Sequence, residues 1–121
     1  MKIVVTAKED TPDGEMDPHF GRARKFVLFD DETGLFSAHD NAQNLNAAQG
    51  AGIQAAESVV RLGAGAVITG HVGPKAFKAL KSAGVRMFLA PTGTTVTAAI
   101  KAFQKNDLEE ASGATKEGHW I

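Results

Sequence analysis

Short apolar runs separated by polar turns dominate the first third of the chain. Residues 3–7, 25–30 and 35–39 are rich in aliphatic, β-branched and aromatic side chains, and each run predicts a strand. Only the polar residues 31–34, which end in glycine, separate the second run from the third. We therefore expect these two strands to form a hairpin.

Beyond residue 47 the apolar positions follow a helical period instead. Three stretches have apolar residues three or four positions apart, at Ile53, Ala56 and Val60, at Phe77 and Leu80, and at Val96, Ala99, Ile100 and Phe103. Two short β-rich runs, residues 64–69 and 85–90, separate the three predicted helices.

This order of elements predicts one α/β domain built on a mixed five-stranded sheet. Hairpin-like connections join the early strands. The later strands follow helical crossovers, whose right-handedness places them beside the first strand. The predicted strand order is 3-2-1-4-5 with flanking helices, which is the ribonuclease H-like arrangement. The domain should cover residues 1–106, and residues 107–121 form a polar C-terminal tail.

The lack of cysteine narrows the chemistry more than any other feature of the composition. The 121 residues are 43% apolar and 22% charged, as in an ordinary globular domain, and include no cysteine. Disulfides, thiolate zinc sites, cysteine nucleophiles and thiolate-ligated iron–sulfur clusters are therefore excluded. Four histidines and fourteen carboxylates remain as metal-binding side chains.

The charge and hydropathy of the chain argue against nucleic acid and membrane partners. The net charge is −1, whereas duplex-binding domains are clearly basic. No apolar run approaches a membrane span, and we expect a cytoplasmic protein. Residues 1–40 carry nine acidic and five basic side chains, whereas residues 41–121 carry five acidic and eight basic ones. An anion site is therefore expected in the later part.

The predicted strand order also predicts where a ligand binds. Open α/β sheets bind ligands at the carboxyl ends of their strands, where the strand order reverses. Here that point lies between the first and fourth predicted strands. Three segments should converge on it, namely residues 8–24, 70–73 and 91–95.

The turn from Thr69 to Pro74 is a candidate anion site. It joins a strand to the start of a helix, where free amides and the helix dipole favour an anion, and His71 adds an imidazole. The alternative is a tight turn whose glycines satisfy backbone geometry while His71 is solvated. Gly93 and Thr94 precede the third helix in the same way, although Thr94 or Thr95 also suits the helix N-cap.

The loop at residues 17–24 places an imidazole, an aromatic ring and two guanidinium groups close together. Arg22 has the fork geometry that binds anions, and His19 lies nearby in the sequence. The alternative is that Phe20 anchors the loop to the core and the arginines are solvated. Phe20 can anchor the loop under either interpretation, whereas Arg22 is either bound to an anion or solvated.

Motifs for enzymatic activity are weak. Residues 50–55 match G-x-G-x-x-A, but no strand precedes them and no acidic residue follows at the expected distance, so we interpret the glycines as points of close backbone approach. No P-loop motif is present, and the first predicted strand lacks the carboxylate that a metal-dependent nuclease needs. We therefore expect a protein that is not an enzyme.

Three segments together carry a resemblance to a known family. They are D-P-H-F-G-R-A at residues 17–23, G-A-G-I-Q-A-A-E at residues 50–57, and A-V-I-T-G-H-V-G-P-K-A-F-K-A-L-K-S-A-G-V at residues 66–85. The chain resembles the dinitrogenase iron–molybdenum cofactor biosynthesis family over residues 1–105, and among its members the stand-alone NifX-type cofactor carriers and the orange protein type. The resemblance implies a ribonuclease H-like fold and non-catalytic binding of a preformed metal–sulfur cluster.

The resemblance further implies a cluster that contains molybdenum, of the Fe–Mo or Mo–Cu sulfide type, held without covalent bonds. A cluster-donor or acceptor protein would be the partner. The expected binding residues are His19, Phe20, Gly21, Arg22, Gly70, His71, Val72, Gly73, Gly93 and Thr94, with His19 and His71 as metal-contacting side chains. The alternative is a regulatory module that binds a small oxyanion or a phosphorylated ligand at the helix N-termini.

Overall fold

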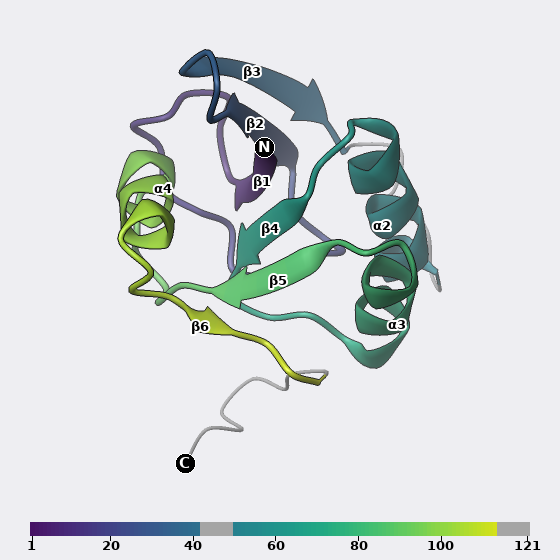
Figure 1. Ribbon diagram of the computed structural model, residues 1–121. Coiled ribbons are helices and arrows are strands. Elements are labelled where there is room, and N and C mark those ends of the chain that lie inside the picture. The colour runs from purple at the N-terminus through teal and green to yellow at the C-terminus, as the bar shows by residue number, and fades with distance from the viewer. Residues whose placement is uncertain (42–49, 114–121) are drawn as a thin grey trace.

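A computed structural model describes residues 1–41 and 50–113 of the chain. Its elements follow in the order β1 (Lys2–Ala7), β2 (Lys25–Asp30), β3 (Leu35–Asp40), α2 (Ala51–Arg61), β4 (Ala66–Thr69), α3 (Pro74–Ser82), β5 (Arg86–Leu89), α4 (Val96–Gln104) and β6 (Glu109–Glu110) (Figure 1). The five predicted strands are present within two residues at each end, and the three predicted helices are all found.

The strands form one mixed sheet in the order β3-β2-β1-β4-β5-β6. Strand β1 pairs antiparallel with β2 and parallel with β4, so that Val4 lies between Leu28 and Val67. Strand β5 continues the parallel part beside β4. The predicted order of the first five strands and the ribonuclease H-like arrangement are confirmed.

A sixth strand extends the predicted sheet. Strand β6 pairs antiparallel with β5, and the Ala111 amide donates to the Met87 carbonyl at 2.8 Å. Arg86 Nη2 lies 2.7 Å from Glu110 Oε1, and this hydrogen bond lowers the pKa of the Glu110 carboxyl. Because backbone pairing and an exposed ion pair hold these residues, no apolar period marks them in the sequence. They belong to the segment that we predicted as a polar tail, of which residues 114–121 lie outside the described chain.

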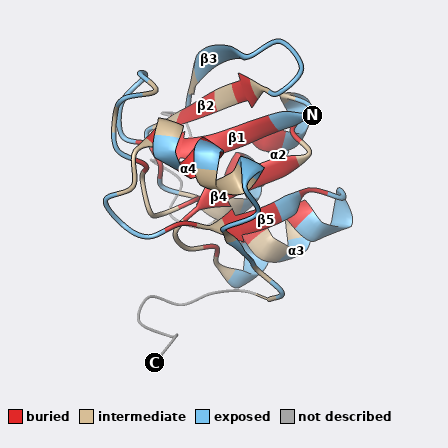
Figure 2. Ribbon diagram, turned by 60° about the vertical axis from the view of Figure 1, so that its left-hand side comes forward, coloured by how far each residue is buried: buried red, intermediate tan, exposed pale blue. Residues whose placement is uncertain are grey.

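Helices cover both faces of the sheet (Figures 1 and 2). One core layer joins Val4 of β1 to α2 and α3, and the other joins Ile3 and Val5 to α4. Alternate β1 side chains therefore enter opposite layers, as the pleat of a strand requires. In the described chain, no helix is long and apolar enough to span a membrane.

The buried face of α2 differs from the predicted stripe. Ala56 is buried, but Ile53 and Val60 are 40% and 43% exposed, and Ala55 and Val59 fill the core instead. These small and β-branched side chains let α2 lie close to the sheet and to α3. Ile53 and Val60 lie on the other side of the helix and are partly exposed to solvent.

Two buried threonines hold the carboxyl ends of β1 and β4 together. Thr6 Oγ1 donates to the Asp17 carbonyl at 2.6 Å and is hydrogen-bonded to Thr69 Oγ1 at 2.8 Å. Both threonine side chains are fully buried. The loop that follows β1 is therefore fixed to the sheet at Asp17.

We expect Thr6→Val to destabilise the fold by about 1–3 kcal/mol, because the isosteric side chain leaves the Thr69 hydroxyl and the Asp17 carbonyl without this partner. Urea denaturation of both proteins gives the difference in the free energy of unfolding. Thr92→Val, at an exposed turn, is the matched control and should stay within about 0.5 kcal/mol of the wild type. Equal stability of the two variants would contradict the assigned role of Thr6.

Candidate functional site

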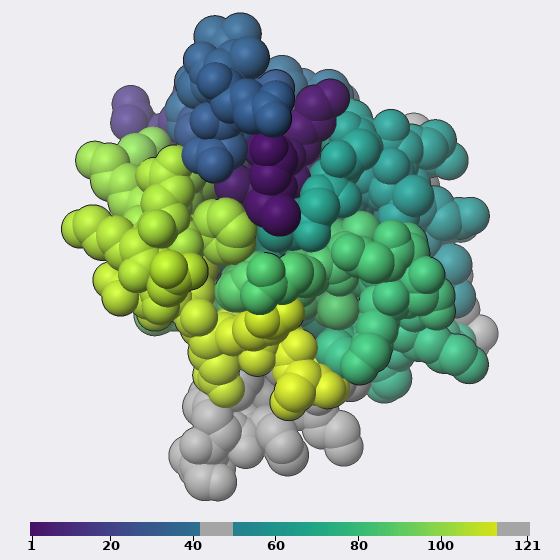
Figure 3. All heavy atoms as spheres, viewed as in Figure 1, coloured from purple at the N-terminus to yellow at the C-terminus, as the bar shows by residue number. Residues whose placement is uncertain are grey.

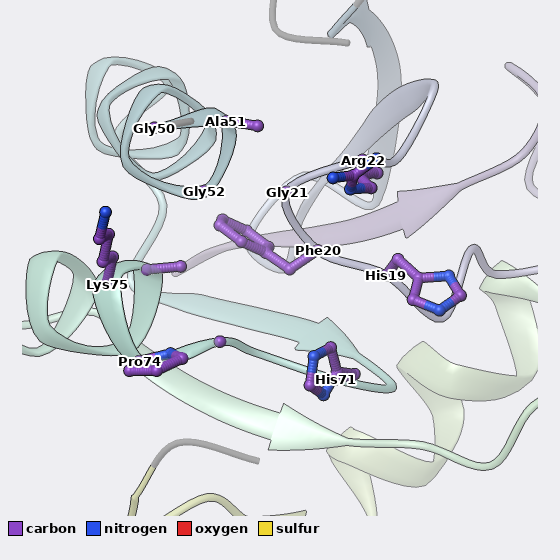
Figure 4. A pocket seen from close by; sticks show the side chains of 12 residues that line it. His19, Phe20, Gly21, Arg22, Gly50, Ala51, Gly52, His71, Pro74 and Lys75 are labelled. Carbon is purple, nitrogen blue, oxygen red and sulfur yellow. The ribbon is translucent and has the colours of Figure 1, made fainter. Parts of the chain in front are cut away.

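A cavity of about 380 Å³ lies beyond the carboxyl ends of β1 and β4, where the strand order reverses. The loop after β1 forms one side, and the first turns of α2 and α3 form the others (Figure 4). It is lined by His19, Phe20, Gly21, Arg22, Gly50, Ala51, Gly52, His71, Gly73, Pro74, Lys75 and Ala76. Its volume falls in the range of small-ligand sites.

The two predicted metal-contacting histidines come together at this cavity. A parallel backbone bridge pairs His19 with His71, and the Phe20 amide donates to the His71 carbonyl at 3.2 Å. The two imidazole rings lie 6.3 Å apart, centroid to centroid, at an interplanar angle of 74°. Backbone pairing therefore fixes the separation of two imidazoles from segments about fifty residues apart in the sequence.

Asp17 holds this loop in place. Its Oδ1 accepts a hydrogen bond from the His19 amide at 3.1 Å and lies 3.8 Å from His19 Nδ1. Its own amide donates to the Thr6 carbonyl at 2.9 Å. The Asp17 side chain is 14% exposed and that of His19 is 46% exposed, so the carboxylate is the anchored group of the pair. Asp17 lies in one of the three sequence motifs, but its role as an anchor could not be predicted from the motif.

Phe20 is the predicted loop anchor, and the structure confirms this role. It is almost completely buried and stacks on Phe26, with ring centroids 6.1 Å apart. One side of Phe20 also lines the cavity between α2 and His71 (Figure 4). The same side chain thus links the core to the apolar wall of the site.

Both helices that reach the cavity begin with an uncapped turn. The N-cap residues are Gly50 for α2 and Gly73 for α3, neither of which has a side chain to accept from the first-turn amides. In contrast, the Thr95 side chain of α4 accepts from the Ala98 amide at 3.1 Å. The positive ends of α2 and α3 are therefore available to an anion in the cavity.

Glycine permits the close approach of the segments around the cavity. A Cβ on Gly21 would lie 3.0 Å from the Gly52 backbone, and one on Gly52 would lie 3.1 Å from Ala76 Cβ. Gly52 thereby fits our interpretation of the G-x-G-x-x-A segment, whereas Gly50 has no atom within 4 Å of an added Cβ and instead adopts a φ of 84°. On the other side of the His71 turn, a Cβ on Gly70 would lie 3.0 Å from three atoms of Pro18.

The cavity is electropositive. Arg22 and Lys75 bring two cations to it, and no residue that lines it in the described chain is acidic. Residues 1–41 and 50–113 contain no group of three His, Asp or Glu side chains arranged to hold a metal ion. The charge of the lining residues therefore favours an anion.

Four predicted site residues occupy other positions. Gly70 packs against Pro18, and Val72 is fully buried in the core. Gly93 and Thr94 are not among the described residues that line the cavity. The backbone carbonyl of Thr94 instead accepts a hydrogen bond from the Met16 amide at 2.8 Å. Six lining residues were not predicted, namely Gly50, Ala51, Gly52, Pro74, Lys75 and Ala76. Their signals in the sequence are the two glycines at the start of α2 and the Gly-Pro pair at the start of α3.

Residues 1–106 match the protein family described as "Dinitrogenase iron-molybdenum cofactor". The chain belongs to this family. The resemblance expected from the three sequence motifs is thereby confirmed, and the family's match ends near the predicted domain boundary.

Solved structures of relatives agree with this placement in the dinitrogenase iron-molybdenum cofactor family. The apo form of the orange protein from Desulfovibrio gigas is 41% identical, with a TM-score of 0.93 over 95% of this chain and 96% of that one. A NifB-like protein from Thermotoga, solved by NMR, is 32% identical, with a TM-score of 0.83 over 97% of this chain and 98% of that one.

A sequence relative extends the comparison to an archaeon. An uncharacterized protein from Methanocaldococcus jannaschii is 32% identical over 97 residues, which are 78% of this chain and 81% of that protein. The similarity spans most of both chains, so it concerns the whole domain and not one motif.

The two glycines that flank His71 and Val72 should respond in opposite ways to substitution by alanine. Gly70→Ala should destabilise this family member by about 1–3 kcal/mol, because the new Cβ collides with Pro18. Gly73→Ala should be tolerated, because its φ of −72° is ordinary and no atom lies within 4 Å of the new Cβ. Thermal and urea unfolding of both variants measure the difference. If Gly73→Ala costs as much as Gly70→Ala, the close packing is not the cause.

Proposed function

We propose that the protein binds a preformed anionic metal–sulfur cluster that contains molybdenum, of the Fe–Mo or Mo–Cu sulfide type, and stores or delivers it without catalysis. The observation that carries the proposal is the cavity between two uncapped helix N-termini, with two paired histidines and no acidic lining residue in the described chain. Membership of the dinitrogenase iron-molybdenum cofactor family supports the choice of cargo.

The protein's own groups would hold the cluster by hydrogen bonds and charge. First-turn amides of α2 and α3 would donate to sulfides on two sides of the cargo. The imidazoles of His19 and His71 would donate or coordinate at the mouth, and Arg22 and Lys75 would neutralise charge. Phe20 would exclude water from one side.

The lack of cysteine determines how tightly this site can hold its cargo. With no thiolate in the chain, the cluster must bring its own sulfides. Each hydrogen bond from a neutral or charged donor contributes modestly in comparison with a metal–thiolate bond. Arg22 and Lys75 are exposed, so the cations can move away as the cargo leaves. Such a site suits storage and delivery.

A second candidate is a regulatory module for a small oxyanion or a phosphorylated ligand. The two uncapped helix N-termini favour it as well, because phosphate binds such amides. The paired histidines favour the cluster, since their ring nitrogens can coordinate a metal as well as donate hydrogen bonds. Competition by inorganic phosphate tests the difference.

Titration of the protein with tetrathiomolybdate, alone and with copper or iron salts, should produce charge-transfer bands that stay with the protein through gel filtration. A large excess of inorganic phosphate should not displace them. Absence of protein-bound bands under all three conditions would overturn the cluster proposal. Binding of phosphate with displacement of the cargo would favour the second candidate.

His71→Ala should release the cluster about tenfold faster or more, because one charged hydrogen bond or metal contact is lost. The variant should keep the circular dichroism spectrum and unfolding midpoint of the wild type. His39→Ala is the matched control, since His39 bonds Ser37 on β3 and lies outside the cavity. An unchanged off-rate in His71→Ala would remove His71 from the site.

A further inference from the structure

A second surface of the molecule, next to the cavity, combines exposed apolar side chains with cations. Helices α2 and α3 run side by side from the cavity, and their side chains form the right-hand side of the molecule in Figure 3. Two hollows of about 310 Å³ and 360 Å³ lie between them, and Ala79 lines both. We call this surface the α2–α3 seam, defined by Ile53, Val60, Ala79, Lys78 and Arg61.

The seam is apolar along its floor. Ile53 and Val60 are among the few large apolar side chains that the described chain exposes, and they lie two helical turns apart on α2. Ala79 faces them from α3. An exposed apolar stripe costs solvation free energy in the isolated protein, and such stripes mark interaction sites. The spacing of seven residues is that of one face of a helix.

Cations surround this apolar floor. Lys75 and Lys78 lie along the α3 side, and Arg61 lies at the far end of α2. Glu57 is the one acidic residue that lines either hollow in the described chain. The partner that this surface complements is therefore apolar along its centre and acidic along its edges.

The length and the side-by-side helices of the seam suit a helix as the bound element of the partner. Helix α2 has eleven residues and is thus about 16 Å long, which matches about three turns of a partner helix. A third helix laid along two side-by-side helices buries an apolar stripe and presents its flanks to the rims. A strand would bring unpaired backbone groups to a surface that offers no sheet edge.

We propose that the α2–α3 seam docks an acidic amphipathic helix of a partner protein. Assigning that partner as the donor or acceptor of the cluster rests on the proposed function. Lys75 lines both the cavity and the neighbouring hollow beside Ile53 and Ala79, so a helix in the seam lies beside the cargo. Carboxylates of the partner then compete with the cargo for Lys75, which favours hand-over at the moment of docking.

The test uses the full chain without cluster and a capped synthetic helix of about three turns, with leucine along one face and glutamate beside it. NMR titration of the isotope-labelled chain should shift amides of α2 and α3 and leave those of α4 unchanged. Raising the salt from about 0.05 M to about 0.5 M should weaken binding. A peptide with lysine in place of glutamate should bind at least about fivefold more weakly.

Charge-reversal variants test whether the peptide binds at the seam. The double variant Arg61→Glu and Lys78→Glu should weaken binding of the acidic peptide at least about fivefold, whereas Lys101→Glu with Lys105→Glu, at the C-terminal end of α4, should not. Each pair reverses two exposed cations, including one in the last turn of a helix, so their net charges are matched. The amide spectrum of each variant checks its fold.

Equal binding of the acidic and basic peptides, shifts outside the seam, or equal effects of the two double variants would overturn the proposal. So would light scattering that shows a dimer broken by Val60→Asp, because a second copy would then be the occupant. These outcomes are independent of the cargo. Arg61→Glu with Lys78→Glu should keep tetrathiomolybdate uptake, and His71→Ala should keep peptide binding.

Discussion

Direct backbone contact between three segments determines the geometry of the cavity. The loop at Gly21 meets the first turn of α2 at Gly52, and Gly52 in turn meets Ala76 of α3, with no side chain larger than a methyl group between them. A larger residue at any of these points would separate the loop from the helices. The positions of His19 and Arg22, and the directions of both helix N-termini, follow from this contact.

Anchors on either side keep these segments in place. Phe20 enters the core beside Phe26, while Asp17 is bound by the Thr6 hydroxyl and by its own hydrogen bond to the His19 amide. The loop is thus fixed before and after His19, although its imidazole remains half exposed. Because the backbone is already fixed, the ordering cost of binding an anion is limited to the exposed cationic side chains.

Much of the fold could be predicted from the sequence, because hydrophobic periodicity marks each long element and crossover handedness orders the strands. Strand β6 could not, since backbone pairing and the exposed Arg86–Glu110 ion pair hold it. The buried face of α2 was also mispredicted, because Ala55 and Val59 have the same spacing as Ala56 and Val60, so the apolar period does not decide which side packs. Local pattern carries no information about such contacts.

The site could likewise be predicted only in part, because some of its residues depend on contacts between distant segments. The rule that ligands bind at the carboxyl ends of strands brought His19 and His71 together correctly. It also predicted Gly93 and Thr94, but α4 covers the opposite face of the sheet from α2 and α3, so the start of α4 lies on the other side. Lys75 and the uncapped start of α2 were missed because their role depends on the contact between Gly52 and Ala76.

The central claim is that the two uncapped helix N-termini bind the metal–sulfur cargo together with His71. Crystals of the protein grown with a molybdenum–sulfide cluster, with anomalous diffraction recorded at the molybdenum edge, test it most directly. We expect an anomalous peak inside the cavity, with sulfides within hydrogen-bonding distance of the first-turn amides of α2 and α3 and beside the His71 ring. A peak only at another surface, with an empty cavity, would contradict it.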